Sequence, residues 1–271
     1  MNRKRIEWNV ENINRLQDFL ASKPMEETNY FGYQVGEAIV YFCGFFVENI
    51  QKCKVLDYGC GMGHIMERFI EKGVNVWGVD MSEEAVDACI RRCRDSQYFH
   101  GVKIFDGGEL PFETAAFDLI TCTECIEHIL PEHMENLLSE LLRVLKPGGR
   151  ILITTPNEEN FLLSELCCPE CNTIYHKVGH VNWFSVDKLT KLMEEHGYTT
   201  ILCHGTDWWQ FMKFIGHYSI LDMSLRQIIR QIKRSYIRIM DKHKNTTESA
   251  VFQLNMHLKR QPHLFYVGTK Q

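Results

Sequence analysis

The chain has 271 residues, of which 45% are hydrophobic, and a formal net charge of −5. This length and apolar content predict one substantial α/β core with additional segments, and the negative charge argues against a protein that coats nucleic acid. Eleven cysteines, with no apolar leader after Arg5, favour a reducing compartment. The most apolar window, residues 38–47, is too short to span a bilayer, so we expect a soluble, cytoplasmic protein.

Residues 1–50 are expected to form a helical flank or lid. Apolar side chains recur at spacings of three and four through about residue 22, which is typical of an amphipathic helix, and Pro24 ends this pattern. Residues 28–33 then form an aromatic loop that either closes over a ligand or packs as ordinary core. A second helix is expected over residues 37–50.

Residues 55–65 contain the pattern around which we expect the core to be organised. An apolar strand is followed by Gly59, Gly61 and Gly63 and then by a helical pattern. Glycine tolerates positive φ and lets the backbone lie against a ligand, and the following helix N-terminus offers free N–H groups. Asp80 ends the next predicted strand, 21 residues after Gly59, where a carboxylate can accept both ribose hydroxyls of a nucleotide.

His64 stands where a dinucleotide fingerprint requires its third glycine, which disfavours a dehydrogenase and favours an adenosyl ligand without pyrophosphate. Residues 55–63 and 74–80 resemble the first two motifs of the class I S-adenosylmethionine-dependent methyltransferases, in particular the ubiquinone-biosynthesis O-methyltransferase and methyltransferase type 11-12 group. The resemblance implies an α/β, Rossmann-like, doubly wound seven-stranded sheet, mostly parallel with the last strand antiparallel, plus helical insertions. It implies S-adenosyl-L-methionine as the cofactor, held by Asp57, Gly59, Cys60, Gly61, Gly63, Asp80, Met81, Asp106 and Thr123.

The remaining core elements alternate as expected for right-handed βαβ units. We expect helices over residues 65–72, 83–94, 131–145 and 187–196, and strands over 74–80, 102–105, 117–122, 150–155, 198–203 and 263–269. Residues 146–149 are expected to end a helix before the strand 150–155, a succession that resembles the same family. Asp106 is expected either beside the adenine, as the resemblance implies, or as a turn residue before Gly107.

Residues 206–260 exceed the simple core and are expected to form a partly helical insertion. Within residues 226–244 lie seven Lys and Arg against one acid, Asp241, and four of them recur at every fourth position and share one helix face: Arg226, Arg230, Arg234 and Arg238. This face is either simply solvated or attracts an anionic surface, such as substrate phosphates or a membrane leaflet.

Glu124, Glu127 and His128 place two carboxylates and an imidazole directly after the strand 117–122. Such a set suits Mg²⁺ or another hard divalent ion, which would activate an acceptor hydroxyl. The spacing resembles that of the ubiquinone-biosynthesis O-methyltransferases and of the small-RNA 2′-O-methyltransferases, which implies a metal role. The alternative is a loop without metal, in which His128 is the general base or only hydrogen-bonds the loop.

Cys168, Cys171, His176 and His180 form a C-x2-C-x4-H-x3-H pattern, which is sufficient for a compact structural zinc knuckle. Cys167 is an alternative to Cys168, and buried thiols without metal are the alternative to zinc. His180 is contested, because in the small-RNA enzymes that the chain resembles a histidine from this region joins the Glu-Glu-His set.

The resulting prediction is an S-adenosylmethionine-dependent methyltransferase acting on a small-molecule acceptor, with a hydroxyl oxygen as the candidate acceptor atom. His128, Glu124 and Glu127 are the expected catalytic residues. Two alternatives stay open: an RNA 2′-O-methyltransferase that uses the Glu-Glu-His site, and a non-catalytic protein that binds S-adenosylmethionine. We expect residues 51–205 and 261–271 to form the core, and residues 1–50, the Cys/His insertion at 157–186 and residues 206–260 to build the acceptor pocket.

Overall fold

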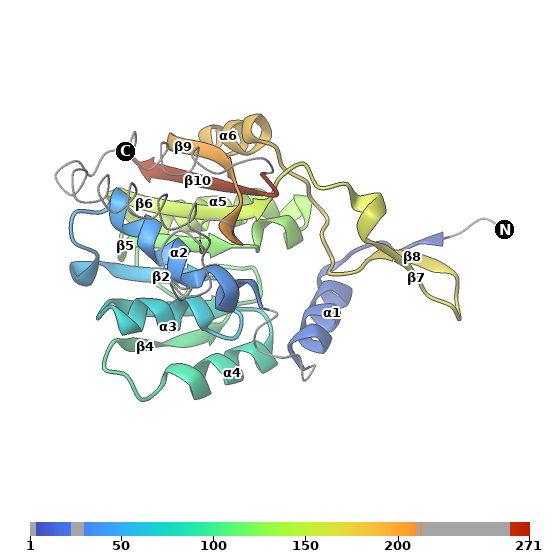
Figure 1. The fold of residues 1–271 in the computed structure, drawn as a ribbon, viewed down its shortest axis with the longest axis horizontal. Helices are drawn as coiled ribbons and strands as arrows, with labels where there is room; N and C mark the ends of the chain where they lie inside the picture. Colours follow the sequence, from blue (N-terminus) through green and yellow to red (C-terminus); the bar gives the residue numbers. More distant parts are fainter. Residues whose placement is uncertain (1–3, 23–29, 210–211, 213–260) are drawn as a thin grey trace, which may run out of the picture.

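The computed structural model describes residues 4–22, 30–209, 212 and 261–271, and its centre is a seven-stranded sheet (Figure 1). The strands are β2 (Lys54–Tyr58), β3 (Asn75–Asp80), β4 (Phe99–Ile104), β5 (Phe117–Thr123), β6 (Leu145–Pro156), β9 (Tyr198–Thr206) and β10 (His263–Lys270). They lie in the order β4-β3-β2-β5-β6-β10-β9. β10 pairs antiparallel with β6 and β9, and β2 to β6 pair in parallel. The predicted doubly wound sheet with an antiparallel last strand is confirmed.

Helices cover both faces of this sheet. Of the helices in the described part of the chain, three pack on one face, namely α2 (Phe31–Phe46), α3 (His64–Glu71) and α4 (Glu83–Cys93), and two on the other, α5 (Pro131–Val144) and α6 (Val186–Glu195). Successive strand residues point to opposite faces, so Val55 belongs to the first apolar cluster and Leu56 to the second. Both are fully buried, which explains the unbroken apolar runs in the central strands.

Helix α2 begins earlier than the sequence predicted. The expected aromatic loop at 28–33 is helical from Phe31, and the helix ends at Phe46 instead of near residue 50, where a short 3₁₀ turn, η2 (Ile50–Lys52), follows. Glycine disfavours helix interiors, yet Gly32 and Gly36 bring α2 close to α3: a Cβ on Gly32 would lie 3.2 Å from atoms of His64 and Ile65. Close helix packing therefore outweighs the low helix propensity.

Strand β6 also begins earlier, at Leu145, and includes the residues 146–149 that were expected to end the preceding helix. Leu145 pairs with Phe117, and the register shifts before Leu119 pairs with Arg150. The irregular strand thus absorbs Pro147 and the two glycines that follow it, residues that normally interrupt a sheet.

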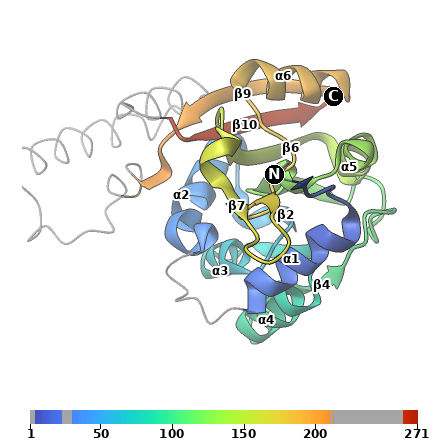
Figure 2. The ribbon, with the colours of Figure 1, turned by 90° about the vertical axis from the view of Figure 1, so that its right-hand side faces the viewer.

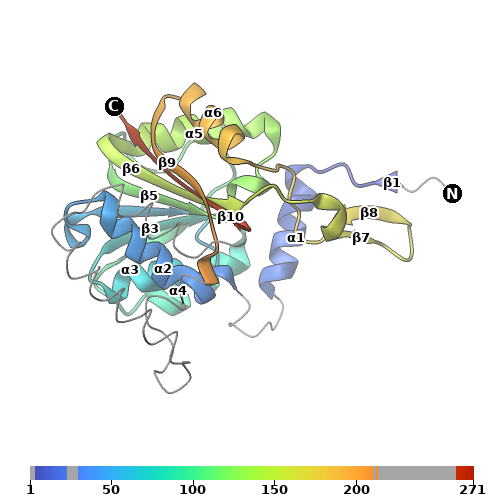
Figure 3. The ribbon, with the colours of Figure 1, turned by 45° about the horizontal axis from the view of Figure 1, so that its top comes forward.

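The N-terminal segment and the 157–186 insertion form a small lobe beside the sheet (Figures 1 and 3). Its three-stranded sheet contains β1 (Lys4–Arg5), β7 (Glu165–Cys167) and β8 (Thr173–His176), with the 3₁₀ turn η4 (Phe161–Ser164) before β7. The predicted helix over residues 1–22 is therefore shorter: α1 is Val10–Ser22. Asn9 starts it, since its Oδ1 accepts from Asn12 N at 2.9 Å, whereas the N–H of Ile6 donates to Ile174 O in the small sheet.

Among the described residues, no helix combines the length and apolarity needed to span a membrane. The predicted basic face with Arg226, Arg230, Arg234 and Arg238 lies outside the described residues. Its attraction to anionic surfaces stays a prediction.

Candidate active site

The glycine turn between β2 and α3 has the expected geometry. Gly59, Gly61 and Gly63 have φ values of 69°, 49° and 81°, a region that other residues rarely adopt. The N–H groups of Gly59 and Cys60 donate to Val79 O at 2.9 and 3.1 Å, which attaches the turn to the end of β3. We call residues 59–63 the cradle.

Replacing Gly63 with alanine is expected to lower the free energy of unfolding by about 2–5 kcal/mol, from left-handed strain and overpacking together. A Cβ at this position would lie 2.4 Å from Cys89 Sγ. Gly61→Ala is the matched control, because it has positive φ but no atom within 4 Å of the added Cβ; its loss should be about 1–2 kcal/mol. Urea unfolding measures both, and equal losses would contradict the packing argument.

Asp80 connects the cradle to the start of α4. Its Oδ2 accepts from Gly61 N at 2.8 Å and its Oδ1 from Ser82 N at 3.0 Å, and Ser82 caps α4 as predicted by accepting from Ala85 N. Burial raises the pKa of Asp80, but these backbone donors stabilise its charged form. The carboxylate therefore stands at the mouth of the cradle, where the ribose was expected.

A cavity of about 320 Å³ lies between the cradle and α1. Of the predicted cofactor residues, seven line it: Gly59, Cys60, Gly61, Asp80, Met81, Asp106 and Thr123. The opposite wall is largely apolar and comes from α1 and the start of α2, through Val10, Ile13, Leu20, Tyr30 and Phe31. The exposed Asp106 also accepts from Gly108 N at 3.2 Å, so it makes the turn and reaches the cavity.

Two predicted cofactor residues do not line this cavity. Gly63, the last residue of the cradle, lies against Cys89 and not against the cavity. Asp57 lies beneath the cradle, 1% exposed, and accepts from Thr121 Oγ1 at 2.7 Å. Burial raises the pKa of Asp57 to about 7. The described contact of this carboxyl is thus inside the core, and its contact with the cofactor stays a prediction.

Asp57 is expected to make stability decrease with rising pH. Its unfolded carboxyl ionises near 3.8 and its folded carboxyl near 7, so the folded state binds more protons between these values and stability is lost from about pH 4 to about pH 7. The free energy of unfolding lost over this range is on the order of 4 kcal/mol. The Asp57→Asn variant should show a shallower slope in urea unfolding of the cofactor-free chain across this range; parallel slopes would refute the prediction.

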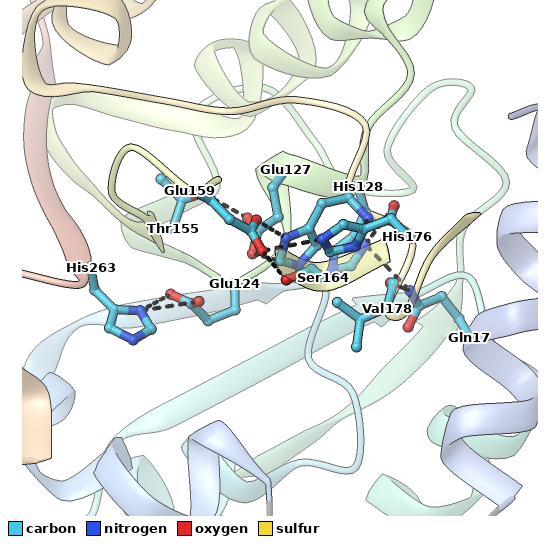
Figure 4. Close-up of polar contacts among 12 residues, drawn as sticks. Gln17, Glu124, Glu127, His128, Thr155, Glu159, Ser164, His176, Val178 and His263 are labelled. Atoms are coloured by element: carbon cyan, nitrogen blue, oxygen red, sulfur yellow. Dashed lines mark hydrogen bonds and ion pairs between the residues drawn. The ribbon is translucent and has the colours of Figure 1, made fainter. Parts of the chain in front are cut away.

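The predicted Glu-Glu-His set is divided by the turn after β5. Glu124 has φ 47° and its N–H donates to Thr154 O at 2.9 Å, and the 3₁₀ turn η3 (Ile126–His128) follows. Glu124 lines the cavity and contacts Nδ1 of His263 at 3.2 Å (Figure 4). It is therefore directed to β10, away from Glu127.

Glu127 is as deeply buried as Asp57, with 1% exposure. Its Oε2 accepts from Thr155 Oγ1 at 2.9 Å (Figure 4), whereas its Oε1 has no hydrogen-bond partner among the described residues. Burial and then the charge of Glu124 raise the pKa of Glu127 well above its usual value. A buried oxygen of this kind requires a proton or a cation.

His128 and His180 lie beside this carboxylate. The two rings are 4.7 Å apart, and Nε2 of His180 lies 3.9 Å from Glu127 Oε1. His128 Nδ1 lies 3.2 Å from Gly179 O and 3.3 Å from Gln17 Nε2. Burial, followed by the charge of His180, lowers the pKa of His128 to about 3, so its imidazole is neutral at physiological pH.

Ligand atoms of Glu127, His128 and His180 all lie within 4.8 Å of one another, as do those of Glu159, His176 and His180. The group around Glu127 thus contains His128 and His180 but not Glu124, which differs from the predicted grouping of Glu124, Glu127 and His128, and magnesium binding stays a prediction. Among the described residues, neither group contains a cysteine, so the predicted zinc set of Cys168, Cys171, His176 and His180 is not assembled.

The hairpin geometry explains why the thiols and the histidines separate. Cys168 and Cys171 lie at the tip between β7 and β8, where Asn172 N donates to Cys168 O at 2.9 Å. Cys171 Sγ lies 3.2 Å from Thr173 Oγ1, and the alternative Cys167 contacts Asn172. His176 ends β8 at the base of the hairpin. The strand between them keeps the C-x2-C pair and the histidines apart.

Glu159 was missed in the sequence. It follows the end of β6, and its carboxylate contacts both His176 and His180 (Figure 4 labels Glu159 and His176). Burial raises the pKa of Glu159, but the hydrogen bonds from His180 and Ser164 and the charges of His180 and His176 together outweigh it, so the pKa is lowered. The available signal was an acid after the carboxyl end of a central strand, the edge where α/β sheets bind ligands.

Comparison with known proteins finds matches in both sequence and fold. The profile of a family described as "Methyltransferase domain" matches residues 2–202. The ubiquinone biosynthesis O-methyltransferase of Coxiella burnetii is 34% identical over 103 residues, which cover 38% of this chain and 43% of that protein. The ubiquinone biosynthesis O-methyltransferase of Pseudomonas aeruginosa is 36% identical over 110 residues, 38% of this chain and 44% of that protein. The chain thus spans less than half the length of these relatives.

Solved structures match over more of the chain at lower identity. A Haloferax volcanii methyltransferase, solved with the activator Trm112, has a TM-score of 0.60 and 16% identity, covering 93% of this chain and 96% of that one. The PH0226 protein of Pyrococcus horikoshii has a TM-score of 0.59 and 17% identity, covering 94% and 99%. At these identities the likeness supports the fold alone.

Proposed function

The chain belongs to the class I S-adenosylmethionine-dependent methyltransferases, and from this premise we propose that it methylates a hydroxyl group of a small apolar or aromatic acceptor. We further propose that a divalent transition-metal ion, held by Glu127, His128 and His180, assists this transfer. The cradle amides and Asp80 would hold the cofactor. Methyl transfer from a sulfonium is an in-line displacement, so the acceptor must be held in one orientation.

The observation that carries the metal proposal is Oε1 of Glu127. It is buried, it lacks a hydrogen-bond partner among the described residues, and two imidazoles lie beside it. One carboxylate with two imidazoles suits Zn²⁺, Mn²⁺, Fe²⁺ or Co²⁺ better than Mg²⁺, which favours oxygen ligands. When bound, such an ion would lower the pKa of an acceptor hydroxyl.

The protein groups have separate tasks in this proposal. The neutral ring of His128 is a ligand and not the general base. Glu124 keeps a carboxylate on the cavity wall, where it can accept the hydroxyl proton and pass it toward His263 at 3.2 Å. The apolar side chains of α1 exclude water from the acceptor.

An apolar acceptor follows from the cavity wall opposite the cradle, where Val10, Ile13 and Leu20 meet Tyr30 and Phe31. The relatives named for O-methylation in ubiquinone biosynthesis support a hydroxyl as the acceptor. The test incubates the chain with S-adenosylmethionine and 3,4-dihydroxybenzoate and measures S-adenosylhomocysteine release. We expect release that needs added Zn²⁺ or Mn²⁺ and stops with EDTA. Release that is unaffected by EDTA and by Glu127→Gln would refute the metal's part.

An RNA 2′-O-methyltransferase is the second candidate. It is favoured by the position of His180 beside Glu127 and His128, because the small-RNA enzymes that the sequence resembles add a histidine from this region. A short synthetic RNA duplex in the same assay separates the two: release with RNA and none with the dihydroxy acid would favour this second candidate.

A further inference from the structure

We infer that Glu159 is a positioning residue: it fixes the proton and the orientation of His180, so that Nε2 of His180 faces Glu127 as a free ligand atom. This inference rests on the proposed metal site. Glu159 itself would not touch the metal, the cofactor or the acceptor.

The contacts of Glu159 use both of its oxygens. Oε2 receives a hydrogen bond from Nδ1 of His180. Oε1 accepts from His176 Nε2 at 3.1 Å and from Ser164 Oγ at 3.1 Å (Figure 4 labels these two partners). The Glu159 side chain is only 17% exposed, so its direction is set by these three partners.

The hydrogen bonds determine which ring nitrogens carry protons. An ionised carboxylate only accepts, so His180 must carry its proton on Nδ1, which leaves Nε2 of the neutral ring without one. Nδ1 of His176 accepts from the N–H of His180 at 3.1 Å, so the proton of His176 is on Nε2, toward Glu159. Both tautomers follow from the position of one carboxylate.

Packing prevents the His180 ring from turning away. It stacks on His176 with centroids 4.5 Å apart and meets the edge of His128 at 4.7 Å. The next two backbone N–H groups, of Val181 and Asn182, donate to Glu127 O at 2.9 and 3.0 Å. Figure 2 shows the small lobe, which supplies His176 and Ser164, standing in front of the sheet ends. We therefore assign the lobe a role in preparing the metal site.

The alternative is a second ion held by Glu159, His176 and His180, whose ligand atoms also lie within 4.8 Å of one another. Both carboxylate oxygens of Glu159 and both ring nitrogens of His176 already have hydrogen-bond partners. Oε1 of Glu127 has none among the described residues. A bound cation would thus replace a missing hydrogen bond only at Glu127. A metal-binding histidine usually donates its other ring N–H to a carboxylate or a similar acceptor, which is the role that Glu159 has here.

The first experiment needs no metal. The full chain is labelled with ¹⁵N-histidine, freed of metal with EDTA, and studied by long-range ¹H–¹⁵N NMR. We expect His180 to carry its proton on Nδ1, and we expect Glu159→Gln to convert it to the Nε2 tautomer or a mixture. Glu165→Gln is the matched control, since Glu165 is in the same lobe, is also 17% exposed, and pairs with Arg5. A wild-type Nε2–H tautomer, or equal spectra for the two variants, would overturn the inference.

The second experiment titrates Co²⁺ and follows its visible absorption. Glu159→Gln should weaken binding by about 10- to 100-fold with one ion per chain retained and with unchanged affinity for S-adenosylmethionine, which also verifies folding; Glu165→Gln should match the wild type. Two ions in the wild type and one in Glu159→Gln would assign an ion to Glu159 itself and overturn its positioning role. A wild type that binds no Co²⁺ would refute the proposed metal site, whereas the NMR result would still decide the role of Glu159.

Discussion

Replacing Glu127 with glutamine is expected to weaken Co²⁺ or Zn²⁺ binding by at least about 100-fold, because the anionic ligand of the proposed site is lost. The affinity for S-adenosylmethionine should stay within about threefold of the wild type, since Glu127 does not line the cofactor cavity. The metal-free variant should be no less stable than the wild type, because a neutral amide is cheaper to bury than a carboxylate. Isothermal titration and urea unfolding measure these quantities.

Glu124→Gln is the informative comparison. The sequence predicted Glu124 as a metal ligand, but it contacts His263 at 3.2 Å and is absent from the group around Glu127. Metal affinity should therefore fall by less than about tenfold, while turnover falls by about 100-fold or more if Glu124 accepts the hydroxyl proton. Equal loss of metal affinity in both variants would restore Glu124 to the ligand set.

Asp80→Asn is expected to raise the Kd for S-adenosylmethionine by about 10- to 150-fold. The carboxylate accepts from Gly61 N at 2.8 Å and Ser82 N at 3.0 Å, and an amide group can accept with only one of its two atoms. Each lost charge-assisted bond costs about 1.5–3 kcal/mol, and the cradle loses its attachment to the start of α4. Isothermal titration calorimetry measures the change.

Asp118→Asn is the control for Asp80. Asp118 is also a strand aspartate, but it accepts from Lys54 N at 2.8 Å and pairs with Lys146 at 2.6 Å. It lies at the start of β5, whereas the cradle follows the end of the parallel strand β2, so the two lie at opposite ends of the strands. Its substitution should leave the cofactor affinity within about twofold. A comparable loss in both variants would mean that the effect of Asp80 is general destabilisation.

The core was predictable because its signals are local. Glycines at alternate positions, Asp80 at the end of the next strand and Ser82 before a helix each act within a few residues, and the structure places them as those signals require. Errors occurred where tertiary contacts override propensity. Gly32 and Gly36 lie inside a helix because α3 packs against them, and Pro147 lies inside a strand that shifts its register.

The candidate site was predictable only in part, again because tertiary contacts decide which side chains meet. The sequence identified Glu127, His128 and His180 as candidates, but the fold decides how they combine. Spacing alone grouped His180 with Cys168, although the β7-β8 hairpin separates them. His263 reaches the site from a distant segment without any local signal, and the position of Glu159 after β6 indicates a place near the site but not its contacts with His176 and His180.

The parallel pairing of β1 with β8 has a consequence for how the chain acquires its structure. Lys4 pairs with Thr173, so this contact closes a loop of 169 residues (173 − 4), and contacts between such distant positions are entropically costly until the intervening chain is compact. We expect the lobe to be added last, after the parallel sheet has condensed. Since His176 and Ser164 come from this lobe, we expect the proposed metal site to be completed at the final step, so that a newly made chain would bind no ion there before its cofactor cradle exists.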